Sequence, residues 1–238
     1  MRTYSPVDPP TFSPALEELV LDGYQGGART AAILFGLKSC TNLRTLRIVP
    51  RFHFHPTATD VSQALLSLKD SLEVLEVREL PPNYQLGSLE RFQKLRQLTI
   101  TLTLLLGQEC DRAESLVQLL PASLKELNLL YRGWFSEWDE DARLKRLVHY
   151  LDDFEAAVSA RLYPQLRSIT LIYAPKSNYR SEASFDPGWS FRSHWIALTS
   201  RFGNSGIALD FPELTGDIVV DIKCSDAGLG KGEGKVDE

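Results

Sequence analysis

Two histidines, placed two residues apart, are the first side chains in this sequence that could do chemistry. His53 and His55 flank Phe54, and residues two apart on an extended strand project from the same face. Both imidazoles could therefore approach one metal ion. Protein zinc sites use three or four ligands, and no further ligand cluster stands near this pair in the sequence. We expect solvated loop histidines, with no metal site and no cofactor.

Other catalytic patterns are also missing from the sequence. There is no Gly-x-Ser-x-Gly nucleophile motif, and no phosphate-binding glycine motif followed by a helix. Residues 228–232 are rich in glycine but stand in a polar tail, and the acidic run 137–141 suits the start of a helix, where it complements the helix dipole. We therefore expect a protein without catalytic residues.

A short aromatic segment is a candidate for binding a protein partner. Tyr131, Arg132, Trp134 and Trp138 fall within eight residues, and Trp, Tyr and Arg are the residue types enriched at interface hot spots. The alternative is that these aromatic side chains pack beneath the long helix expected after them. The sequence leaves both interpretations open.

A repeated block, Leu-x-x-Leu-x-Leu, must position all these residues. It starts at Leu16, Leu43, Leu72, Leu95, Leu124 and Leu166, with Ile or Val in place of Leu at some later positions. The intervals are 27, 29, 23, 29 and 42 residues. Four intervals fall in or near the range of about 20–29 residues typical of leucine-rich repeats. A single repeat cannot bury its own leucines, so neighbouring repeats must stack.

The blocks predict strands, and the segments between them predict helices. Apolar residues at helical spacing favour helices at residues 28–37, 61–68, 86–92, 113–120, 144–158 and 191–202. The β-branched residues after Leu98 favour extension of the fourth strand through residues 99–103. We expect a degenerate seventh strand at 207–211, paired in a terminal hairpin with a strand at 218–222.

These blocks resemble the leucine-rich repeat family across residues 15–211. Segments 120–127 and 163–167 are similar to the irregular repeats of fungal F-box-type proteins, many of which are substrate receptors of ubiquitin ligases. The resemblance implies an α/β solenoid of about seven repeats, with a curved parallel sheet on the concave side and helices on the convex side. It also implies a protein partner, including an SCF-type adaptor if a longer form carries an F-box.

The sequence departs from that family in two respects. The asparagine expected three residues after the last leucine of each block is missing, because these positions hold Tyr24, Arg51, Leu80, Thr103, Arg132 and Ala174. No F-box is visible in the first 15 residues. We expect an extended segment at 1–14, the repeats with their terminal hairpin at 15–222, and a disordered tail at 223–238.

The residues between the block leucines should point out of the strand face and form the concave surface that solenoids use for binding. The alternative is a plain solvated sheet face. The expected partner-binding residues of this surface are Asp22, Arg47, Val49, Glu76, Arg78, Thr99, Glu126, Asn128, Leu130, Thr170 and Ile172.

The net charge and the cysteine content exclude further classes of function. The net charge of -5 argues against a general nucleic-acid binder, and three widely separated cysteines favour a reducing compartment. No signal peptide or membrane-spanning run is visible, so we expect a cytoplasmic or nuclear protein. We expect a non-catalytic interaction module, specifically a substrate-recognition region. The rival hypotheses are a structural or self-associating protein, and an enzyme built on the repeats.

Overall fold

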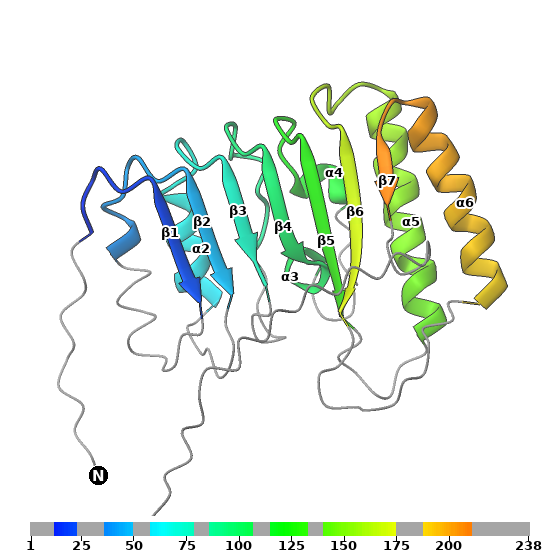
Figure 1. Ribbon diagram of the computed structural model, residues 1–238, viewed down its shortest axis with the longest axis horizontal. Coiled ribbons are helices and arrows are strands. Elements are labelled where there is room, and N and C mark those ends of the chain that lie inside the picture. Colours follow the sequence, from blue (N-terminus) through cyan, green and yellow to red (C-terminus); the bar gives the residue numbers. More distant parts are fainter. Residues whose placement is uncertain are drawn as a thin grey trace, which may run out of the picture.

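A seven-stranded, all-parallel sheet forms the centre of the molecule (Figure 1). The computed structural model describes residues 12–22, 36–49, 58–78, 86–106, 115–132, 140–174 and 188–210. The strands follow one another in chain order across the sheet. They are β1 (Glu18–Asp22), β2 (Thr45–Val49), β3 (Val74–Val77), β4 (Gln97–Thr101), β5 (Glu126–Arg132), β6 (Ser168–Ala174) and β7 (Ala208–Asp210). The expected α/β class, the parallel sheet and the seventh strand are confirmed.

The register of the sheet aligns the block leucines in rows. Leu46 pairs with Leu75, and Leu98 pairs with Leu127, and all four side chains are completely buried. Since side chains alternate along a strand, the residues between these leucines must face the other way. In β2 this alternation is visible as a buried Leu46 and Ile48 around an exposed Arg47.

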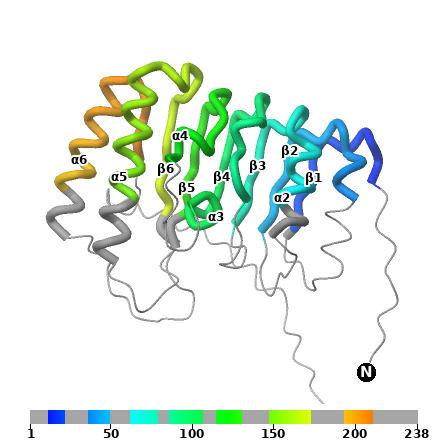
Figure 2. Tube along the Cα trace, turned by 180° about the vertical axis from the view of Figure 1, so that it is seen from behind, coloured from blue at the N-terminus to red at the C-terminus, as the bar shows by residue number. Residues whose placement is uncertain are grey.

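The described helices cover one face of the sheet, as the view from behind shows (Figure 2). They are α2 (Ala58–Leu66), α3 (Leu102–Leu106), α4 (Leu116–Leu119), α5 (Glu140–Ser159) and α6 (Gly188–Asn204). The core lies between these helices and the leucine rows. We call the opposite face, which carries the residues between the block leucines, the open face.

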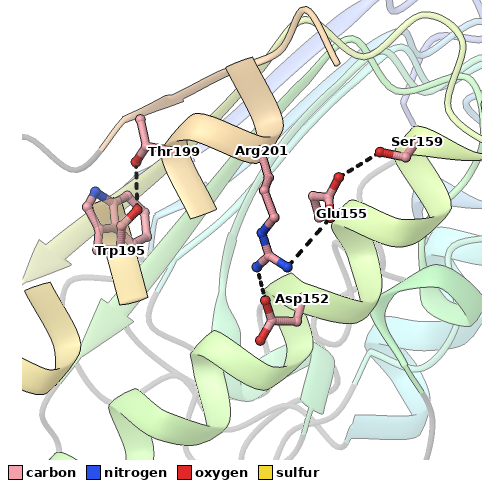
Figure 3. Close-up of polar contacts among 6 residues, drawn as sticks. All are labelled: Asp152, Glu155, Ser159, Trp195, Thr199 and Arg201. Atoms are coloured by element: carbon pink, nitrogen blue, oxygen red, sulfur yellow. Dashed lines mark hydrogen bonds and ion pairs between the residues drawn. The ribbon is translucent and has the colours of Figure 1, made fainter. Parts of the chain in front are cut away.

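The two long helices close the β7 end of the molecule and pack on each other. Phe154 of α5 and Phe202 of α6 are completely buried. Both belong to the apolar stripes that the sequence predicted for these helices. At their exposed side, Arg201 pairs with Asp152 and lies 3.9 Å from Glu155, while the Ser159 hydroxyl donates to Glu155 at 2.6 Å (Figure 3). A polar line therefore runs along the α5–α6 seam, outside the core.

Two expected elements differ from the structure. Residues 86–92 form no helix but an irregular segment with a turn at Glu90 and Arg91, although Leu86, Leu89 and Phe92 are buried. This 23-residue repeat is the shortest, and Gly87 turns the chain with a φ of 73°. The fourth strand ends at Thr101, and the run 102–106 is the helix α3 with four buried leucines. A strand would have turned about half of those side chains to the open face.

Side-chain hydrogen bonds join neighbouring repeats at the turns. Asn42 Nδ2 donates to the Pro14 carbonyl at 3.0 Å, Ser88 Oγ to the Gln118 carbonyl at 3.0 Å, and Ser123 Oγ to the Leu95 carbonyl at 2.8 Å. These bonds give hydrogen-bond partners to backbone carbonyls of neighbouring repeats, one of them in α4.

Several expectations fall outside the described residues. They are most of the extended segment 1–14, most of the helix 28–37, the hairpin strand 218–222 and the tail 223–238.

Candidate functional site: the open face of the sheet

The open face brings together residues that are about one repeat apart in sequence. Its central row takes one residue from each strand, in register across the whole sheet. From β1 to β7 the row reads Val20, Arg47, Glu76, Thr99, Asn128, Thr170 and Asp210. Five of these seven residues were expected as partner contacts from the sequence alone.

An ion-pair cluster occupies the β2–β3 part of this row. Arg78 Nε forms an ion pair with Glu76 Oε1 at 2.5 Å, and Arg47 Nε lies 3.9 Å from Glu76 Oε2. The side chain of Glu76 is 15% exposed, whereas Arg47 and Arg78 are 48% and 46% exposed. One carboxylate thus orients two guanidinium groups and leaves one net positive charge on this part of the face.

The β4–β6 part of the row is polar and uncharged. Asn128 Nδ2 donates to Thr99 Oγ1 at 3.1 Å, and Thr170 is half-buried beside them. Ser168 of the neighbouring row is also half-buried, while Glu126 is exposed. The central row here offers hydroxyl and amide groups to a partner, and Glu126 adds one exposed carboxylate beside it.

The apolar positions of the face are arranged differently from the expectation. Val49 and Ile172 are half-buried, but Leu130 is only 7% exposed and lies outside the main core cluster. Leu130 is therefore not an exposed apolar spot. Val20, on the edge strand β1, is 51% exposed and takes that role. Its exposure follows from the edge position, which the repeat pattern does not show.

The aromatic segment is described only at its beginning. Tyr131 and Arg132 form the end of β5, and their side chains lie outside the described part, as do Trp134 and Trp138. Asp22 ends β1, again without a described side chain. Its role and that of the aromatic segment stay predictions.

Chemical groups capable of catalysis or metal binding do not converge in the described part of the chain. No group of three or more His, Cys, Asp or Glu side chains there could hold a metal ion, and His53 and His55 lie outside it. Cys40 is buried behind the sheet, and its burial raises the pKa of its thiol. A buried thiol with a raised pKa is a poor nucleophile.

The class of protein defined so far is an α/β chain with a sequentially ordered parallel sheet, covered by helices on one face. Comparison with protein-family models, with curated proteins and with solved structures found no match for the chain. Among the described helices, none is long and apolar enough to cross a membrane.

Proposed function

We propose that this chain is a solenoid of the leucine-rich repeat type, whose open face binds a protein partner without catalysis. The observation that carries the proposal is the central row of the open face. It presents a charged segment at Arg47, Glu76 and Arg78 next to a hydrogen-bonding segment at Thr99 and Asn128. A rigid sheet that holds such groups in fixed register is preorganised for recognition, which lowers the entropic cost of binding.

The resemblance to F-box-type proteins specifies what kind of protein the partner would be. The open face would recognise a protein substrate of a ubiquitin ligase, and the chain would work in the cytoplasm or the nucleus, where sparse cysteines stay reduced. A pull-down with a purified SCF-type adaptor tests this version. Lack of adaptor binding by the 238-residue chain would restrict the proposal to a general interaction module.

Affinity capture followed by mass spectrometry identifies the partner, and charge reversal then locates the surface. We expect Arg47→Glu combined with Arg78→Glu to weaken binding of the purified partner, because both guanidinium groups are half-exposed on the open face. Asp153→Lys is the control, since Asp153 is an exposed residue of α5 on the helical side. Binding by the open face would be contradicted if the double variant and the control lost equal affinity, or if neither lost any.

Self-association is the second candidate. The exposed Val20 lies on the edge strand β1, and an exposed sheet edge can pair with another chain. Light scattering separates the candidates, because a monomer at micromolar concentration would argue against self-association.

A further inference from the structure

The residues that immediately precede the first six strands form a second ordered row, at the amino-terminal edge of the sheet. We call it the amino-end row. In each case the backbone carbonyl of this residue accepts N–H groups from the start of the next strand. Lys125 N–H donates to the Arg96 carbonyl at 2.8 Å, and Arg167 N–H donates to the Lys125 carbonyl at 2.8 Å. The row consists of Glu17, Arg44, Glu73, Arg96, Lys125 and Arg167.

The charges of this row divide it into two halves. Over β1–β3 the signs alternate, and Arg44 lies 3.8 Å from Glu73 in an ion pair. Over β4–β6 all three residues are cationic, and we call Arg96, Lys125 and Arg167 the basic row. Arg96 and Arg167 are exposed and Lys125 is half-buried. Within the described residues none of these three makes an ion pair with a carboxylate.

Further charges near the basic row leave it positive. Lys94 and Arg161 are exposed in the turns that lead into β4 and β6. The carboxylates closest in sequence are Glu90, whose charge contributes to the raised pKa of Tyr163, and Glu126, the first residue of β5. Glu73, the neighbour of Arg96 in the amino-end row, is paired with Arg44. Arg91 is also exposed in the turn before β4, so six cations stand against the three carboxylates of Glu73, Glu90 and Glu126, although the whole chain has a net charge of -5.

The spacing makes these like charges interact. Adjacent strands lie about 4.8 Å apart, so the backbones of the three basic residues span about 10 Å. This is close to the Debye length of about 8 Å at physiological salt. Like charges on neighbouring strands are unfavourable for the sheet, whereas an external anion placed across all three would convert this repulsion into attraction.

We propose that Arg96, Lys125 and Arg167 form a docking site for an acidic peptide segment of a partner protein. The basic row is short and matches two or three carboxylates, whereas nucleic acid is bound by a more extended basic face. The charge complementarity is local and confined to β4–β6, because the β1–β3 half alternates in sign and carries one net negative charge, from Glu17, Arg44 and Glu73. The site lies outside the central row of the open face and does not depend on it.

Fluorescence anisotropy with a labelled octaglutamate peptide tests the proposal on the full chain. We expect binding to weaken by at least about tenfold in the triple variant Arg96→Gln, Lys125→Gln, Arg167→Gln, and to weaken as NaCl rises from about 0.05 to about 0.5 M. Arg44→Gln is the matched control in the same row and should change binding by less than about twofold, because Arg44 is paired with Glu73 and lies outside the basic row. The pair Arg47→Gln, Arg78→Gln controls for the open face and should behave like Arg44→Gln.

Three outcomes would overturn the proposal. They are absence of octaglutamate binding by the unmodified chain, equal weakening by the triple variant and by Arg44→Gln, and binding of a labelled octathymidylate as tight as that of octaglutamate. Thermal unfolding of each variant shows whether it is folded, and the three single substitutions report on the site if the triple variant does not fold. A fourth such outcome is loss of octaglutamate binding in the open-face control alone, which would assign the anion to Arg47 and Arg78 instead.

Discussion

Asn128 and Thr99 are joined by a hydrogen bond of 3.1 Å across β4 and β5, on the face of the sheet opposite the helices. The preceding residue of β5, Leu127, points the other way and is completely buried. Adjacent residues of one strand thus belong to two environments, a polar surface and an apolar core. The two environments should differ in how much a substitution lowers the free energy of unfolding.

Substitution of these two neighbours tests the assignment of the faces. Leu127→Ala should lower the free energy of unfolding by about 2–5 kcal/mol, because it leaves a cavity in the core. Asn128→Ala should cost about 1 kcal/mol or less, since water can replace its hydrogen bond on a half-buried surface. Urea unfolding of both variants measures the two values. Equal losses would mean that the alternation of β5 is misassigned.

Tyr163 fixes the turn before β6 to the preceding repeat. Its hydroxyl donates to the Val117 carbonyl at 2.9 Å and lies 3.3 Å from the Leu120 carbonyl, and its ring packs edge-on against Phe154. Tyr163→Phe keeps the ring but leaves both carbonyls without this donor, so we expect a loss of about 1–3 kcal/mol in urea unfolding. A loss as large as that of Tyr163→Ala would show that the hydroxyl accounts for the whole effect and the ring for none.

The same tyrosine predicts a dependence of stability on alkaline pH. Burial, assisted by the charge of Glu90, raises the pKa of Tyr163 from 10.0 to about 12. The neutral phenol is therefore favoured in the folded state, and its contribution to stability is complete below pH 10 and is lost as the pH rises through 12. We expect the free energy of unfolding to fall over this window, and to fall less in Tyr163→Phe. Identical pH profiles for the two proteins would contradict the raised pKa.

The polar line between α5 and α6 should contribute little to stability. Arg201 pairs with Asp152, but the two side chains are 45% and 39% exposed, and exposed ion pairs contribute about 0.2–1 kcal/mol. A double-mutant cycle with Arg201→Gln and Asp152→Asn measures the coupling, which should shrink at high salt. A coupling above about 2 kcal/mol would indicate that this seam is much less hydrated than its exposure suggests.

Much of the architecture follows directly from the sequence. The block starting at Leu95 places Leu98 in the core and Thr99 on the surface, because side-chain direction along a strand is fixed by its period of two. The long helical stripe containing Leu151 and Phe154 likewise predicts α5. The local pattern failed at residues 86–92, predicted as a helix, and at residues 102–103, predicted as strand from their β-branched neighbours, because short apolar runs are compatible with turn, helix or strand. Packing against the neighbouring repeats decides between these possibilities.

The sequence alone determined which face of the sheet each strand residue occupies, since each block repeats the same alternation. Only the tertiary structure decided which of them become neighbours. Arg96, Lys125 and Arg167 are separated by 29 and 42 residues in the chain, and the register of the parallel sheet places them on consecutive strands. It likewise decided that Leu130 is buried and that Val20 is exposed. Side-chain direction is a property of the local backbone, whereas proximity and burial depend on what packs beside each strand.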